Sequence, residues 1–265
     1  MNVGLVAAAV SGLATSLGAL PFVFVRSVPR RTYDGILGLG AGLMMAAATL
    51  GLLSEAVHDI RVDGVMDWGR LGIVVLGFAV GVVIASFMDR YIPHHHAGGH
   101  HEHLGHAPGH DHHDEFGDAR RGYAVVGALT LHRIPEGLAI GAGFAVPGSS
   151  HLGVMLAIAV GIQNVCEGLV MAAPLRAGGI SGARGFAIVA TTGLVIPAAA
   201  IVGGAAAGLA ASAMPFILAL AGGTLIYITS NEIIPESHSH GHEGTASAGV
   251  VLGFLLTMVL QAILH

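Results

Sequence analysis

Residues 131–141 read LHRIPEGLAIG and place a His, an Arg and a Glu, with a Pro among them, inside an otherwise apolar segment. His132 and Glu136 are four residues apart and therefore share one face of a helix, while Arg133 lies three residues before the Glu. The whole chain of 265 residues is 54% hydrophobic and only 10% charged, whereas a soluble domain carries roughly 25% charged residues. The composition therefore predicts an integral membrane protein that holds ionisable groups inside the bilayer.

Eight apolar segments are long enough to cross a bilayer, for which a helix needs about 20 residues. We predict them at residues 3–25, 35–54, 71–89, 122–146, 152–175, 185–211, 214–236 and 246–264. The expected fold is an all-α integral membrane protein, an eight-transmembrane-helix bundle. Helices 1–3 fall in residues 1–92, a single long loop in residues 93–121, and helices 4–8 in residues 122–265. No signal peptide is expected, because the first apolar segment is too long and no basic residue precedes it.

Arginine positions indicate how the bundle is oriented, since the chain contains 11 basic residues and none of them is Lys. Eight fall in loops on one side, namely Arg26, Arg30, Arg31, Arg90, Arg120, Arg121, Arg176 and Arg184, against only Arg61 and Arg70 on the other. The positive-inside rule predicts that the side with eight is cytoplasmic and that both termini are outside. We expect a multi-pass protein of the cell membrane, plasma or inner. The net charge of −5 gives no reason to expect a nucleic-acid partner.

The long loop 93–121 holds ten of the 17 histidines, interleaved with Asp, Glu, Gly and Pro. Such a composition cannot bury a core, so we predict disorder. Because imidazole binds zinc, copper, nickel and iron, we predict a cytoplasmic metal-collecting loop, with a plain solvated linker as the alternative. A shorter echo, ESHSHGHE, follows at residues 236–243 on the same side. The loop histidines are His94, His95, His96, His100, His101, His103, His106, His110, His112 and His113.

A second polar motif, IQNVCEGLVM at residues 162–171, matches the first in register 31 residues later: HRIPEGL is followed by QNVCEGL. Two adjacent helices could then present His132, Glu136, Gln163 and Glu167 to one centre. Two carboxylates facing each other in a low dielectric repel unless a proton or a cation lies between them. His, Glu and Gln can all bind a divalent metal, so a metal site is predicted; a structural polar network between helices is the alternative. Pro135 is expected to free one carbonyl and bend the helix.

HRIPEGLAIG and IQNVCEGLVM, with a His-rich loop before the first, resemble the fourth and fifth helices of the ZIP family of divalent-metal transporters. LIYITSNEIIPESHSHGH resembles the seventh helix of the prokaryotic branch, and AGLMMAAATLGLLSEA the second. The resemblance covers nearly the whole chain, including the eight spans and the outside termini. It implies passage of Zn²⁺, and often of Fe²⁺, Mn²⁺ or Cd²⁺, into the cytoplasm through a metal site between helices 4 and 5.

The resemblance also implies roles for individual residues. The primary ligands would be His132, Glu136, Gln163 and Glu167. Met44 would bring a thioether near them, although a Met in an apolar helix is also ordinary core filling. The remaining positions are Asn164 as a further metal residue on the fifth helix, Glu232 and Asn231 on the exit route, and Glu55, His58 and Asp59 at the outer end of the second span, where they guide incoming ions or form a solvated helix end.

Two positions depart from the family pattern. Arg133 stands where the prokaryotic pattern has Asn after the His, and Ile196 stands where the family often has Glu before the Pro of the sixth helix. Both missing groups belong to a second, neighbouring metal site. We therefore predict that Arg133 is a tethered substitute for the second metal; the alternative is that its long side chain extends toward the cytoplasmic edge.

Transport is the function that these residues favour. An intramembrane zinc-dependent hydrolase is the alternative from another class, but the chain has no HExxH motif. No P-loop motif is present either, so ATP is not the expected energy source. The predicted partners are divalent ions, with Zn²⁺ as substrate and site ion ahead of Fe²⁺, Cd²⁺ and Mn²⁺, and the lipid bilayer. A homodimer is left open. The single cysteine, Cys166, excludes an internal disulfide.

Overall fold

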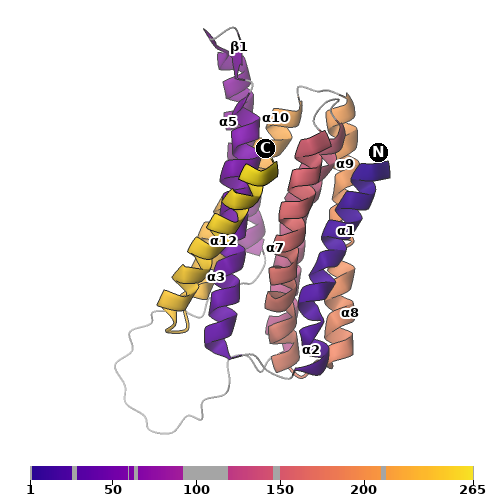
Figure 1. Ribbon diagram of the computed structural model, residues 1–265, viewed down its shortest axis with the longest axis vertical. Coiled ribbons are helices and arrows are strands. Elements are labelled where there is room, and N and C mark those ends of the chain that lie inside the picture. Colours follow the sequence, from indigo (N-terminus) through magenta and orange to yellow (C-terminus); the bar gives the residue numbers. More distant parts are fainter. Residues whose placement is uncertain are drawn as a thin grey trace.

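The computed structural model describes residues 2–25, 29–58, 60–62, 65–91, 119–145, 150–209 and 213–264. The ten loop histidines and Asp59 therefore lie outside the described residues. Within the described residues the protein is helical apart from one short hairpin, and the long helices run side by side (Figure 1). The N- and C-terminal ends of the chain lie at the same end of this bundle, as an even number of spans requires (Figure 1).

Eight helical segments correspond to the eight predicted spans. The first is α1 (Asn2–Ala19) with the short α2 (Pro21–Phe24), and the second is α3 (Arg30–Ala46), which continues through a π-helical segment η1 (Ala47–Leu53) into α4 (Ser54–His58). Next come α5 (Trp68–Tyr91), α6 (Ala119–Ala145) and α7 (Ser150–Ala177). The sixth is α8 (Gly182–Thr192) with α9 (Val195–Leu209); the seventh is α10 (Ala213–Ile228), π-helical η2 (Thr229–Ile233) and α11 (Ile234–Ser237); the last is α12 (Glu243–Leu264).

Seven of these segments are long and apolar enough to cross a membrane. The segment not counted among the seven is α6, which carries the first polar motif. It is 27 residues long, but His132, Arg133 and Glu136 lower its hydropathy. The polar residues that make α6 the least apolar span are buried inside the bundle, so the helix needs no aqueous surroundings to accommodate them.

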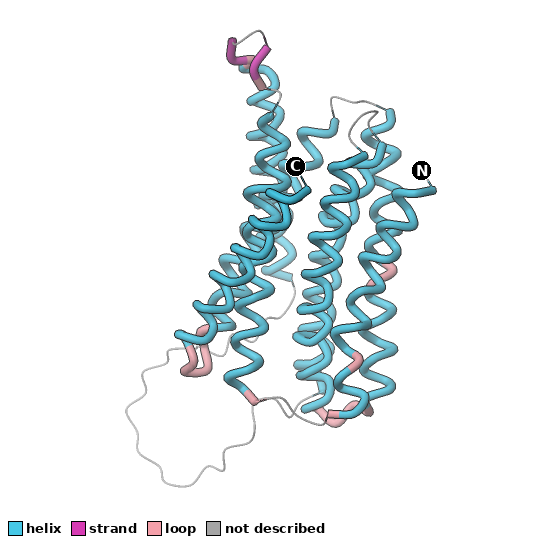
Figure 2. Tube along the Cα trace, in the orientation of Figure 1, coloured by secondary structure: helices cyan, strands magenta, loops and turns pink. Residues whose placement is uncertain are grey.

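Three local predictions need correction. The sixth span is not one continuous helix, because α8 ends at Thr192 and α9 begins at Val195. The second span extends from Arg30 to His58, beyond the predicted 35–54. The segment between the second and third spans is not simply a loop. It holds an antiparallel pair, β1 (Arg61–Val62) with β2 (Val65–Met66), beyond the end of α5 (Figure 2).

The helices form two sets. In one set, α3 packs most closely on α12, and α5 on α10. In the other, α6 packs on both α7 and α9, and α1 packs on α7. Figure 1 shows α12, α3 and α5 together on one side and α7, α1, α8 and α9 on the other. The two polar motifs therefore lie within one helix set, on the neighbouring helices α6 and α7.

Glycine permits the closest of these contacts. A methyl group at Gly42 of α3 would collide with the Val250 carbonyl of α12, and one at Gly203 of α9 would collide with the Leu138 carbonyl of α6. In a membrane, helix association depends on such close backbone packing rather than on the hydrophobic effect. Glycine at positions of this kind thus serves the helix interfaces.

Candidate metal centre

The two polar motifs are brought together in the core. His132, Arg133, Glu136, Gln163, Asn164 and Glu167 are each 3% exposed or less. In each motif the two polar residues precede the Glu by four and three residues, spacings at which side chains on a helix are neighbours of the Glu. The helix α6 runs continuously through Pro135. Polar side chains buried this deeply depend on other groups of the protein for their hydrogen bonds.

The amide of Gln163 joins the two carboxylates. Its nitrogen, Nε2, donates one hydrogen bond to Glu136 Oε1 and another of 2.9 Å to Glu167 Oε1. An amide nitrogen carries two hydrogens, so one group can serve both acids. The second oxygen of Glu136, Oε2, is buried and has no hydrogen-bond partner in the described part of the chain. A buried carboxylate oxygen without a donor is costly, and a cation is what such an oxygen would bind.

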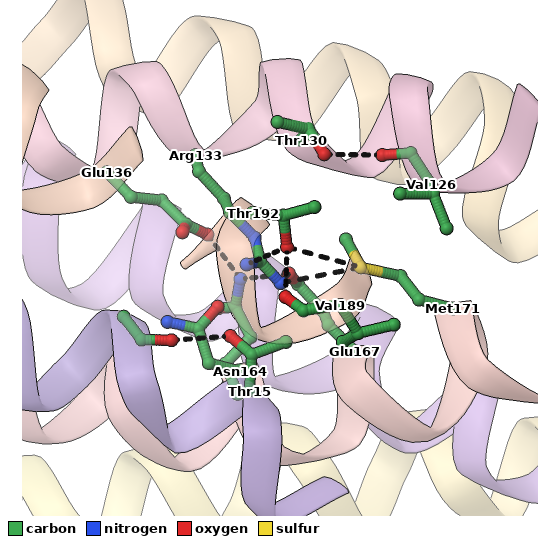
Figure 3. A network of polar contacts seen from close by, with 12 residues as sticks. Thr15, Val126, Thr130, Arg133, Glu136, Asn164, Glu167, Met171, Val189 and Thr192 are labelled. Atoms are coloured by element: carbon green, nitrogen blue, oxygen red, sulfur yellow. Dashed lines mark hydrogen bonds and ion pairs between the residues drawn. The ribbon is translucent and has the colours of Figure 1, made fainter. Parts of the chain in front are cut away.

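Arg133 is completely buried and lies across the interface of three helices (Figure 3). Its Nη2 is 3.3 Å from Glu167 Oε2 and 3.7 Å from Met171 Sδ, both on α7. Its Nη1 donates a 2.8 Å hydrogen bond to Thr192 Oγ1 on α8. The side chain is not at the surface, as the alternative of an edge-seeking arginine would require. Neither Met171 nor Thr192 was predicted from the sequence to be a site residue.

His132 faces the other helix set. Its Nε2 lies 3.8 Å from Glu232 Oε2, and Glu232 belongs to the π-helical segment η2. The predicted ligand and the predicted exit-route acid are therefore neighbours. Asn231, beside Glu232, is exposed. A π-helical turn often marks a functional position within a helix, and here it displays the acid opposite His132.

Asn164 is hydrogen bonded to α1. Its Nδ2 donates a 2.9 Å hydrogen bond to the carbonyl of Ser11 on α1, so the structure uses it to attach α7 to α1. Met44 is fully buried in α3, three residues before η1 begins. At the far end of that span, in α4, Glu55 is half-buried and His58 is exposed.

Among the described residues, no three His, Cys, Asp or Glu side chains are already arranged as a metal-binding group. The structure brings together Glu136, Glu167 and the amide of Gln163, and it turns His132 toward Glu232. In this arrangement the Gln163 amide presents its nitrogen to both carboxylates, so its oxygen would have to turn inward to bind an ion shared with them.

A second buried carboxylate lies at the beginning of α3. Asp34 is completely buried; its Oδ1 is 2.9 Å from His240 Nδ1, and its Oδ2 is 3.0 Å from His242 Nδ1. The His240 ring also packs edge-on against Tyr33. Both imidazoles come from the turn between α11 and α12, within the segment predicted to be an echo of the metal-collecting loop. That segment is folded, and two of its histidines are bound to Asp34.

The sequence matches a family model described as ZIP Zinc transporter over residues 94–261. A Myxococcus xanthus protein named zinc transporter GufA is 36% identical over 263 residues, covering 98% of each chain. Zinc transporter ZIPB of Bordetella bronchiseptica is 35% identical, over 95% of this chain and 78% of that protein. Human zinc transporter ZIP11 is 29% identical, over 94% of this chain and 93% of its own. With its eight helical segments and its paired motifs in α6 and α7, the chain belongs to the ZIP zinc transporter family.

Proposed function

We propose that this protein carries Zn²⁺ across the membrane into the cytoplasm, with Fe²⁺, Cd²⁺ and Mn²⁺ as competing ions. Membership of the ZIP family supports zinc transport, and the relatives named above are zinc transporters. The family consists of transporters and not of enzymes, so the hydrolase alternative is set aside.

The observation that carries the proposal is the convergence of two buried carboxylates. Glu136 and Glu167 come from different helices and meet at one amide nitrogen, and Glu136 Oε2 has no donor within the described residues. We propose His132, Glu136, Gln163 and Glu167 as the ligands of the ion, with Met44 nearby. A mixed set of imidazole, carboxylate and amide donors suits Zn²⁺. Glu232, next to His132, then receives the ion on its way out.

We propose that the site holds a single ion because Arg133 takes the place of a second. Two glutamates and one guanidinium sum to a single negative charge, which still favours a divalent cation. Arg133 is completely buried, and its Nη2 lies 3.3 Å from Glu167 Oε2; both observations support this role. The apolar Ile196, at the position where the family often has a Glu, is consistent with this role. If the guanidinium replaces the second metal ion, no further carboxylate is needed to bind one.

The direction of transport depends on orientation. We propose that the loops with eight arginines, including the His-rich loop 93–121, are cytoplasmic and that the termini are outside. In intact cells, a membrane-impermeant maleimide should label a cysteine placed at Ser181 only after the membrane is permeabilised. A cysteine at Asp67 should react without permeabilisation, in a background with Cys166→Ser. The reverse pattern would invert the proposed orientation.

Uptake by purified protein in liposomes tests the site. Glu136→Ala and Glu167→Ala should each abolish Zn²⁺ uptake while the protein remains in the membrane. Glu243→Gln, which changes an exposed acid at the start of α12, is the control and should transport normally. Wild-type uptake in both alanine variants would refute the proposed ligands.

Metal stoichiometry tests the single-ion proposal. With residues 94–113 deleted, the wild-type site should hold one tightly bound ion per chain. The double variant Arg133→Asn with Ile196→Glu should hold two. Two ions in the transmembrane site beside an intact Arg133 would overturn the proposal.

A further inference from the structure

Two of the groups that hold the Arg133 guanidinium, Thr192 and Met171, have no role in the proposed transport mechanism. Figure 3 shows it surrounded by Glu167, Met171 and Thr192. Thr192 supplies the hydroxyl at 2.8 Å from Nη1, and Met171 the thioether at 3.7 Å from Nη2. Both side chains are buried, at 8% and 0% exposed respectively. Thr192 is the last residue of α8, directly before the interruption of the sixth span.

The hydrogen bonds of Thr192 prepare it to accept from a cation. A hydroxyl has one hydrogen, and that of Thr192 has two acceptors within reach, the Val189 carbonyl at 2.6 Å and Met171 Sδ at 3.8 Å. The hydrogen goes to the carbonyl, which is nearer and is the stronger acceptor. The oxygen of Thr192 therefore remains as an acceptor that points to Arg133. The neighbouring Thr191 makes the same bond to its own helix, 2.7 Å to the Ile188 carbonyl, but is exposed. Only one of the two threonines thus serves the buried guanidinium.

Without this hydroxyl the guanidinium has an obvious alternative. Arg133 and Glu136 are three residues apart on α6, a spacing at which side chains can pair. Glu136 Oε2 is buried and lacks a hydrogen-bond donor among the described residues. A guanidinium that turned to this oxygen would occupy the place proposed for the transported ion, and it would compete with that ion.

We propose that Thr192, assisted by Met171, is a positioning residue that holds Arg133 on Glu167 and keeps it off Glu136. This inference rests on the proposed function, in which Glu136 binds the ion. We call Thr192 and Met171 together the Arg133 dock. This dock explains how a permanently charged side chain can neutralise one glutamate of a metal site without blocking the other. It also gives a role to the end of α8, which contributes no proposed metal ligand.

A double-mutant cycle tests the dock through the KM of Zn²⁺ uptake in liposomes. Thr192→Val keeps the shape of the side chain and removes the acceptor, so KM should rise about tenfold, the scale of one hydrogen bond to a charged group. The maximal rate per folded protein should remain close to that of the wild type. Thr192→Ser should restore the wild-type KM, and Thr191→Val is the matched control on the lipid-facing side. Met171→Leu should raise KM less than Thr192→Val does, because a thioether is a weak acceptor.

The decisive comparison is made in an Arg133→Asn background. There Thr192→Val should leave KM unchanged, because no guanidinium remains to be misplaced. An equal rise in both backgrounds, or no rise in either, would overturn the dock. Failure of the proposed function looks different: uptake would then survive Glu136→Ala and Glu167→Ala. If Thr192→Val does not fold, the same cycle is run with Met171→Leu, which changes only a thioether.

Discussion

Glu136 in the centre of the bundle and Asp34 at the beginning of α3 are both almost completely buried carboxylates, at 1% and 0% exposed. Their hydrogen bonding differs. Asp34 has one imidazole nitrogen at each oxygen, at 2.9 and 3.0 Å. Glu136 shares the amide of Gln163 with Glu167, and its other oxygen has no donor in the described residues. A fully satisfied carboxylate stabilises the fold, whereas an incompletely satisfied one is available to a cation.

Removal of the charge at each acid should separate these two roles most clearly. Glu136→Gln keeps the shape but cannot bind a divalent ion as a carboxylate does, so Zn²⁺ uptake should fall about 100-fold or more. Asp34→Asn should leave the maximal uptake rate of the folded protein within about twofold of wild type. Initial rates in liposomes, normalised to the amount of folded protein, measure both. Equal losses of uptake in Glu136→Gln and Asp34→Asn would show that the two carboxylates do not differ in their roles.

The neutral ligands should matter less than the acids. His132→Ala and Gln163→Ala should each raise KM for Zn²⁺ about tenfold, because water or another ligand can replace one neutral donor. Selectivity should also change, which competition by Cd²⁺ and Mn²⁺ would reveal. Complete loss of uptake in either variant, with the protein correctly inserted, would contradict this prediction. It would show that the neutral donor is as necessary for uptake as Glu136.

Asp34 should reveal its role in stability. Loss of the charge in Asp34→Asn weakens two imidazole contacts at a buried position and should cost about 1–3 kcal/mol. The thermal unfolding midpoint of the detergent-solubilised protein should fall accordingly. His240→Ala should lower it more than His242→Ala, because the His240 side chain is 7% exposed and that of His242 is 35% exposed. An unchanged midpoint in Asp34→Asn would show that this cluster does not stabilise the fold.

The smallest effect is expected from the His-rich loop. Deletion of residues 94–113 should leave the maximal rate of uptake within about twofold of wild type, because none of the proposed transport ligands lies in this segment. The apparent affinity or the response to cytoplasmic zinc should change, since the loop is predicted to collect metal. Uptake measured at several Zn²⁺ concentrations on the outer side gives the apparent affinity. Uptake measured at several Zn²⁺ concentrations on the cytoplasmic side gives the response to cytoplasmic zinc. A folded deletion variant without transport would contradict the prediction.

Much of the fold could be predicted because the bilayer restricts it severely. A helix is the simplest way to satisfy the backbone within lipid, so mainly apolar segments located seven of the eight helical segments to within a few residues, and the second span, Arg30–His58, less closely. The interruption between Thr192 and Val195 was not predicted, and neither were the π-helical segments η1 and η2. These features replace regular helical hydrogen bonds by local alternatives that cost little in a packed bundle, and hydropathy does not report them.

Part of the arrangement of the candidate site could be predicted from the sequence. The paired motifs identified Glu136, Gln163 and Glu167 as neighbours, and the structure brings them together. The contacts of Thr192 and Met171 with Arg133 could not be predicted. A threonine that bonds its own helix and a methionine in an apolar span are both common in transmembrane helices. The contacts of Asp34 with His240 and His242 could not be predicted either. The two histidines lie about 200 residues away in the chain, and no local pattern links them to Asp34.

The sequence by itself determined that this protein spans a membrane, that two of its helices carry matched polar motifs, and that Arg133 stands in one of them. These properties follow from composition and from the helical repeat, which are local. Only the tertiary structure decided which buried groups satisfy one another: Arg133 with Glu167 and Thr192, His132 with Glu232, Asn164 with Ser11, and Asp34 with His240 and His242. The reason is physical. In a medium without water a buried polar group depends on partners within the protein, and how the helices pack decides which partners lie within reach.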